Sequence, residues 1–340
     1  MWLAGVIIIL LLISYSGLKS PKVQTFISKN LADKLSKELN TEVTIEGVDI
    51  KLIKTIVLEG ILIKDLHKDT LLYVKYFSLD VSNYNLDSNY FNISAVELNK
   101  ASVYLKKYLG EDALNFQFII DHFDTKDKAT ANARWLIDGD NIALNNIHFK
   151  YLDENSADTM NSGINFKDLD LIVSNGFFDE MHLIGDTLIA KVENLNVTEK
   201  SGFKVNKFTA ITSISSNYAA INYLNLRTNS SEIIGNLNLR YNTYADFSDF
   251  INEIQIGSHL DSTKLNLSDI AYFVPSLNGA DQEVLISADF NGSLNSFKLS
   301  DLDIAFEKYT KIIGSIDVIG LPDIQNTLIH FDDLIIKTHY

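Results

Sequence analysis

The sequence of 340 residues contains no cysteine, only three prolines and few basic side chains. Without cysteine the chain can form no disulfide bond, no thiolate metal site and no cysteine nucleophile. Its 29 Lys and Arg residues are outnumbered by 44 Asp and Glu residues, which gives a formal net charge of −15. This acidic excess argues against a nucleic-acid partner, which needs a basic protein face, and against a protein lying flat on anionic lipid.

Motifs that carry chemistry are also missing. The seven histidines form no His-x-x-x-His or Glu-x-x-His pair, and neither a glycine-rich phosphate loop nor Gly-x-Ser-x-Gly occurs. Asp138, Asp140 and Asn141 resemble a fragment of a calcium loop, but its other ligands are absent. A pair of carboxylates in a cleft remains an open alternative. We expect no catalytic residue, no metal and no cofactor.

The first prominent feature that is present is an apolar run, WLAGVIIILLLISYSGL, at residues 2–18. Seventeen residues form a helix of about 26 Å, which is within the range of a membrane-spanning segment. We therefore predict a transmembrane anchor over residues 1–18. Its representative residues are Trp2, Ile7, Leu10, Leu12 and Tyr15. A cleaved signal peptide, with a small-x-small site at Ser14-Tyr15-Ser16, and a buried core helix are the alternatives.

A second segment, residues 19–40, is typical of an amphipathic helix. Pro21 suits the first turn, apolar residues recur every four positions from Val23 to Leu39, and Asn40 is a stop signal. The polar side carries several lysines. This helix either lies on a membrane surface or closes one end of the core that follows.

From residue 41 to the end the pattern changes to a period of two, which indicates half-buried strands. Clear examples are Phe77 to Val81, Val284 to Phe290 and Ile312 to Val318, with turn formers such as Asn175-Gly176 and Asn291-Gly292 between the runs. With few helices in between, a parallel sheet with helical crossovers is excluded, so residues 41–340 are expected to form an extended, curled antiparallel sheet. Short helices are expected near residues 247–254 and 270–273.

Several segments together resemble the N-terminal part of the TamB/AsmA-like family, in the form found in Bacteroidota. They are PKVQTFISKNLADKLSKELNTEVTIEGVDI (residues 21–50), KDTLLYVKYFSLDV (68–81), ALNFQFIIDHF (113–123) and LSDIAYFVPSL (267–277). The resemblance implies an inner-membrane helix and a long periplasmic β-taco, a curled sheet with an apolar groove. Members of this family are longer, so we expect this chain to be the N-terminal portion of a longer protein.

The family resemblance implies transport of phospholipid between the inner and outer membranes, with the bulk of the chain in the periplasm. Lysines after the apolar run would by themselves place that bulk in the cytoplasm, so we expect basic residues upstream of Met1. The candidate groove-lining residues are Phe77, Leu79, Val81, Leu237, Leu239, Val284, Ile286, Ala288, Ile316 and Val318. Ordinary core packing is the alternative for each of them.

Two other functions remain open. One is a scaffold for assembly of outer-membrane proteins, with an Omp85-type barrel as partner through a further C-terminal region, as the resemblance also implies. The other is an adhesin or surface β-repeat protein, which predicts a packed interior without a continuous groove. The leading expectation is a single-pass inner-membrane protein that carries phospholipid.

Overall fold

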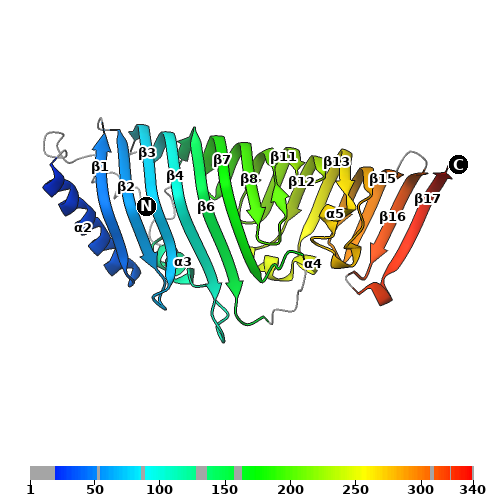
Figure 1. Cartoon of the computed structure of the whole chain (residues 1–340), viewed down its shortest axis with the longest axis horizontal. Helices are drawn as coiled ribbons and strands as arrows, with labels where there is room; N and C mark the ends of the chain where they lie inside the picture. The colour runs from blue at the N-terminus through cyan, green and yellow to red at the C-terminus, as the bar shows by residue number, and fades with distance from the viewer. Residues whose placement is uncertain are drawn as a thin grey trace. The chain divides into compact units, whose positions relative to one another are not determined.

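The computed structural model describes residues 20–51, 54–85, 89–127, 136–156, 163–306, 310–321 and 323–338. The chain is mainly β-structure, as expected (Figure 1). It forms two compact units. Unit 1 takes in the described residues up to Ser156 together with Asn165–Glu180 and Val197–Lys200. Unit 2 takes in residues 163–164, Met181–Asn196 and the described residues from Ser201 onward.

Unit 1 contains two helices and a twisted sheet. Its elements are α2 (Pro21–Leu39), β1 (Val43–Lys51), β2 (Thr55–Lys64), β3 (Thr70–Asn85), β4 (Tyr90–Lys107), α3 (Gln117–Asp127), β5 (Leu136–Gly139), β6 (Ile142–Asp153) and the first part of β7 (Asp168–Ile184). Strands β1 to β4 pair antiparallel in chain order, and β6 pairs antiparallel with β7.

One pairing corrects the expectation of a purely antiparallel sheet. β4 pairs in parallel with β5 and with β6, from Tyr90↔Leu136 to Lys107↔Asp153. After β4 the chain passes through α3 and starts β5 at the end of the sheet where β4 began, so the strands run in the same direction. The sequence-based exclusion of a helical crossover was therefore wrong at this position.

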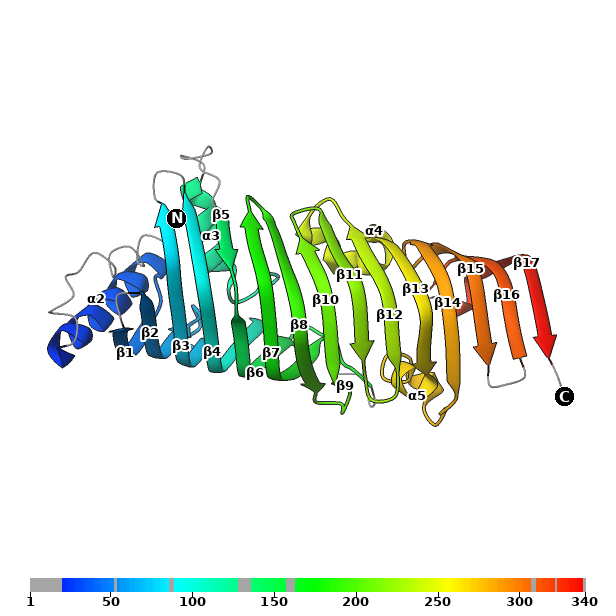
Figure 2. The same cartoon turned by 90° about the horizontal axis from the view of Figure 1, so that it is seen from above.

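The predicted amphipathic helix is confirmed as α2. Proline stands at its first turn, and Asn40 adopts the left-handed conformation (φ 51°) that ends a helix. Helix α2 lies beside β1 and β2 (Figure 2). Its apolar side packs on these strands, where Ile27 and Ala32 join Ile45, Val48 and Ile56 in one buried cluster. The helix thus covers the sheet at the β1 side of unit 1.

Unit 2 is a sheet of consecutive antiparallel strands with short helices between some of them. Its elements are β8 (Thr187–Glu199, through Asn196), β9 (Lys204–Val205), β10 (Lys207–Ile214), β11 (Tyr218–Arg227), β12 (Glu232–Arg240), η1 (Tyr244–Asp249), α4 (Phe250–Glu253), β13 (Gln255–Asn266), α5 (Leu267–Ile270), η2 (Pro275–Leu277), β14 (Glu283–Gly292), β15 (Ser296–Phe306), β16 (Thr310–Ile319), η3 (Ile324–Asn326) and β17 (Leu328–Thr338). β8 pairs with β10, and β10 to β17 then pair in chain order.

The short helices of unit 2 lie at the ends of strands. η1 and α4 precede β13 and α5 follows it, so they lie at opposite ends of this strand (Figure 2). The helix expected at residues 270–273 is instead α5, which begins at Leu267 because the side chain of Asn266, not that of Ser268, caps it. Near α4, Ile254 is fully buried.

The predicted transmembrane anchor, with Trp2, Ile7, Leu10, Leu12 and Tyr15, lies outside the described residues. Among the helices that are described, none combines the length and the apolar character needed to cross a bilayer.

Candidate functional site

Unit 2 has one apolar face, which follows directly from the strand register. Side chains alternate between the two faces of a strand, and residues paired across strands share a face. On β14, Ile286 lies between Thr263 of β13 and Ile304 of β15, and Ile304 pairs with Ile312 of β16. The apolar face comprises Leu188, Ala190, Val192, Phe208, Ala210, Ile214, Ala219, Ile221, Leu224, Leu226, Ile233, Leu237, Leu239, Ile256, Leu260, Leu265, Val284, Ile286, Ala288, Phe290, Phe297, Leu299, Leu302, Ile304, Phe306, Ile312, Ile316, Val318, Ile329, Phe331, Leu334 and Ile336.

The opposite face of unit 2, here called the polar face, carries charges. Lys298 lies 3.8 Å from Asp317, and Lys311 lies 2.8 Å from Asp303, as cross-strand ion pairs. Pairs of this kind at the surface contribute little stability but keep the face hydrated. The two faces of the same strands therefore differ sharply in character.

Each strand of unit 2 from β11 onward contributes to a row of irregular positions, here called the bend row. On β11, β13, β15 and β17 one residue has positive φ and the pairing slips by one residue, which is the pattern of a β-bulge. These residues are Tyr223, Ser262, Asp301 and Asp333. The residues opposite them on the even-numbered strands β12, β14 and β16 are small: Gly235, Ala288 and Gly314.

The burial of the bend row shows which way the sheet bends. On the polar face Tyr223 is 78% exposed, and Ser262, Asp301 and Asp333 are also exposed. The next residue along the chain points to the apolar face and is buried, as Thr263 at 0% and Leu302 at 1% exposure show. Bulges bend a strand locally. The sheet of unit 2 is therefore bent toward its apolar face, which is the concave side.

On either side of the bend row the apolar face is only partly covered by protein. Leu188 and Ile214 are 38% and 45% exposed, and Leu237, Ile286 and Ile316 are half-buried. Apolar patches that stay open to water on a protein surface often mark a binding site. The arrangement can hold an elongated apolar ligand.

Unit 1 repeats this construction. Its apolar face contains a row of paired residues, Ile45, Ile61, Val74 and Ala101. Next to this row the alternation of apolar and polar side chains along each strand shifts by one residue, at positions that include Gly60, Lys100 and Asn146, all with positive φ. Here more of the face is enclosed, in clusters around Val74 and around Leu79. The switch of phase between Ile45 and Val48, visible in the sequence, is the first position of this row.

All ten predicted groove-lining residues lie on the apolar faces of the two units. Those that are buried are Leu79, Val81, Val284, Ala288 and Val318. Those that are half-buried are Phe77, Leu237, Leu239, Ile286 and Ile316. Contact between these side chains and lipid stays a prediction.

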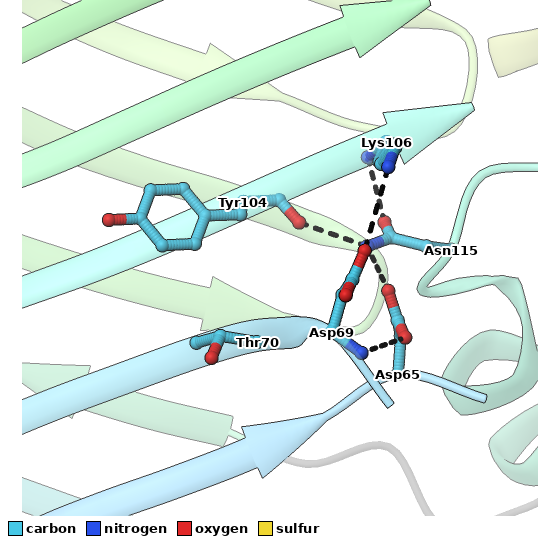
Figure 3. Close-up of a pocket in the computed structure, with 6 residues that line it drawn as sticks. All are labelled: Asp65, Asp69, Thr70, Tyr104, Lys106 and Asn115. Atoms are coloured by element: carbon cyan, nitrogen blue, oxygen red, sulfur yellow. Dashed lines mark hydrogen bonds and ion pairs between the residues drawn. The ribbon is translucent and has the colours of Figure 1, made fainter. Parts of the chain in front are cut away.

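A polar pocket of about 240 Å³ in unit 1 is the other candidate site (Figure 3). No pattern in the sequence predicted it. Asp65, at 0% exposure, accepts hydrogen bonds from the Asp69 backbone N–H (3.0 Å), the Tyr108 hydroxyl (2.8 Å) and the Asn115 side-chain amide (2.9 Å). Lys106 Nζ lies 2.9 Å from Glu154 and 3.5 Å from Asp69. These polar groups form hydrogen bonds and ion pairs with one another and so hold loops of unit 1 together. The pocket is therefore best explained as a structural joint, the name used for these residues below.

The charges of this joint stabilise one another. The hydrogen bond from Tyr108 lowers the pKa of Asp69, and the contact with Glu154 raises the pKa of Lys106. Burial, together with the two neighbouring carboxylates, raises the pKa of Tyr108. The pocket lies on the side of unit 1 opposite its apolar face, because Tyr104 and Lys106 alternate with Val103 and Leu105 of that apolar face.

The described residues contain no group of three or more acidic or histidine side chains arranged to hold a metal ion. No protein-family model matches the chain, and no curated protein matches it either. The resemblance to TamB/AsmA-like proteins therefore rests on the sequence segments alone, and the geometry has to carry any proposal about function.

Proposed function

We propose that this chain carries phospholipid along the apolar faces of its bent sheets, between the inner and outer membranes. The observation that carries the proposal is the open apolar face of unit 2, which is concave, spans β8 to β17 and is backed by a polar face. Each methylene that leaves water for such a surface gains about 0.8 kcal/mol. An acyl chain is thus strongly driven onto the face, while its headgroup can stay hydrated.

Movement along the face needs no chemistry. Aliphatic and aromatic side chains repeat from strand to strand at a spacing of about 4.8 Å, so neighbouring positions offer an acyl chain similar contacts. A ligand that is bound almost equally well at successive positions can shift between them without crossing a large barrier. An anchor in the inner membrane, with the bulk of the chain in the periplasm, would bring this surface to its lipid source.

The experiment is site-specific photocrosslinking in the full chain. A photoreactive residue replaces Ile286 or Ile316 on the apolar face, and matched controls carry it at Leu285 or Ile319 on the polar face of the same two strands. Both controls are exposed, at 47% and 52%. After incubation with phosphatidylethanolamine–phosphatidylglycerol vesicles, mass spectrometry should find lipid adducts at the apolar-face positions only. Equal adducts at all four positions, or none at Ile286 and Ile316, would refute the proposal.

A second candidate is a scaffold for the assembly of outer-membrane proteins, with an Omp85-type barrel as partner. An open strand edge can template an incoming strand through backbone hydrogen bonds. Crosslinks from β17 to nascent barrel proteins, without lipid adducts at Ile286, would favour this function.

A further inference from the structure

The segment of η1 and α4 forms a wall at one end of the apolar face of unit 2. Tyr241 continues the pairing of β12, since its N–H donates to the turn before β11 (3.2 Å), and it has the same phase as Leu239 on the apolar face. The ring of Phe247 packs edge-on against that of Tyr241, with 4.8 Å between the ring centroids. Ile254, in phase with Ile256 of the apolar face, is fully buried where α4 meets β13. The segment therefore lies on the apolar side of the sheet.

Two aromatic side chains of this wall, here called the aromatic rim, are open to water. They are Tyr244, at 59% exposure, and Phe247, at 40% exposure. The Tyr241 hydroxyl next to them donates to the Ser215 carbonyl at 2.7 Å, which places the wall beside Ile214, an exposed residue of the apolar face. The aromatic rim thus continues the apolar face beyond the ends of the strands.

The two flanks of the bend row differ in length at β11 and β12. Toward the aromatic rim, the stretch from Gly235 of the bend row to Tyr241 spans about 20 Å in strand geometry. In the other direction β12 begins at Glu232, which is only about 10 Å from Gly235. β11 has the same asymmetry about Leu224. The flank that leads to the aromatic rim, here called the long flank, is therefore about twice as long as the opposite flank.

The long flank matches the length of one acyl tail. The hydrocarbon core of a bilayer is about 30 Å thick, so the tails of one leaflet reach about 15 Å from their headgroups. A tail of this length, laid along β11 and β12, extends from the aromatic rim to the bend row. There the buried residues Leu224 and Gly235 leave no open surface for it to continue. The opposite flank of these two strands is too short for such a tail.

We propose that a phospholipid lies across unit 2 with its tails along the long flank of β11 and β12 and its headgroup at the aromatic rim. The proposal rests on the function proposed above and adds the orientation of the ligand. Tyrosine suits the boundary between tail and headgroup, because an aromatic ring with a polar tip prefers the level between hydrocarbon and water. Tyr244 and Phe247 are thus positioning residues, and the bend row marks the depth that the tail ends reach.

The experiment uses two photoreactive phosphatidylethanolamines, one with a diazirine next to the headgroup and one with a diazirine at the tail end. Each is supplied to the full chain in phosphatidylethanolamine–phosphatidylglycerol vesicles, and the adducts are mapped by proteolysis and mass spectrometry. We expect the headgroup-side probe to label residues 241–250 and the tail-end probe to label residues next to the bend row, such as Leu237 and Ile286. The reverse pattern, or equal labelling of both regions by both probes, would overturn the proposed orientation. Absence of adducts on the apolar face with either probe would refute the lipid function itself.

A matched pair of variants tests the aromatic rim. Tyr244→Ser removes an exposed ring of the rim, and Tyr223→Ser removes an exposed ring of the polar face. We expect the ratio of headgroup-side to tail-end adducts at residues 241–250 to fall several-fold in Tyr244→Ser only, with circular dichroism unchanged in both variants. Tail-end adducts at Ile286 should persist in both. Equal ratios in the two folded variants would show that the aromatic rim does not position the headgroup.

Discussion

At the scale of single residues, the acidic excess serves the fold itself. Asp65 accepts three hydrogen bonds while fully buried, and Asp246 and Asp323 accept hydrogen bonds from backbone N–H groups of their own turns. The backbone hydrogen bonds lower the pKa of Asp246. The side-chain amide of Asn326, together with backbone hydrogen bonds, lowers the pKa of Asp323. The carboxylates hold turns together, so their number does not by itself indicate a ligand.

Asp65→Asn should destabilise unit 1 by about 1–3 kcal/mol, the cost of leaving buried donors unpaired. An amide has one accepting oxygen, whereas the Asp65 carboxylate accepts from the Asp69 N–H on one oxygen and from Tyr108 and Asn115 on the other. Urea denaturation of the full chain measures the change. Asp112→Asn, the same substitution at an exposed position, serves as the control, and equal stability of the two variants would contradict the role of Asp65.

At the scale of elements, the bend row is what turns flat strands into a concave surface. In unit 2 a residue with positive φ on β11, β13 and β15 lies opposite a small residue of the next strand, and Asp333 of β17 lies beside Gly314 of β16. The large side chain that follows, such as Leu302, fills the inside of the bend. The bend therefore requires small residues at these positions of the even-numbered strands β12, β14 and β16.

Gly235→Ala should destabilise unit 2 by about 1–3 kcal/mol, the usual cost of strain at such a backbone position. A Cβ at Gly235 would meet the backbone carbonyl oxygen of His259, which cannot move without breaking the pairing of β12 with β13. Thermal unfolding followed by circular dichroism measures the loss. Gly47→Ala is the control, since its Cβ would have only ordinary contacts at 3.6 Å, and equal losses would show that the bend does not require glycine.

The sequence predicted the elements whose signals are local. The apolar repeat from Val23 to Leu39, flanked by Pro21 and Asn40, gave α2 within its observed bounds, and period-two runs gave most strands. Helix α3 was missed because it contributes no apolar repeat long enough to stand out from the strands around it. Since α3 carries the chain back along the sheet, the parallel pairing of β4 with β6 was missed with it.

The candidate surface was predictable residue by residue but not as a bent face. Each predicted lining residue follows from alternation along its own strand. The bend row appears in the sequence as a three-residue step between apolar positions, as from Ile221 to Leu224 or from Leu299 to Leu302. Only the register shows that these steps align across strands. The joint around Asp65 joins residues about 40 to 50 positions apart, which no local pattern reveals.

At the scale of the whole molecule, both units use the same plan: one apolar face, one polar face and a bend toward the apolar side. In unit 1 helix α2 and the clusters around Val74 and Leu79 enclose much of that face. In unit 2 the flanks of the bend stay open. An adhesin with a packed interior predicts that protein covers these flanks, whereas the proposed carrier of acyl chains requires them to be open.

Charges placed on the two faces of unit 2 should therefore have opposite consequences for lipid binding. Ile286→Glu with Ile316→Glu puts one carboxylate on each side of the bend, where bound acyl chains would force it out of water at a cost of several kcal/mol. Leu285→Glu with Ile319→Glu adds the same charge on the polar face. Phospholipid that co-purifies with the full chain, counted per protein by mass spectrometry, should fall several-fold in the first variant only. Because Ile286 and Ile316 are only half-buried without ligand, circular dichroism should find both variants folded, and equal lipid content in two folded variants would separate the apolar face from lipid binding altogether.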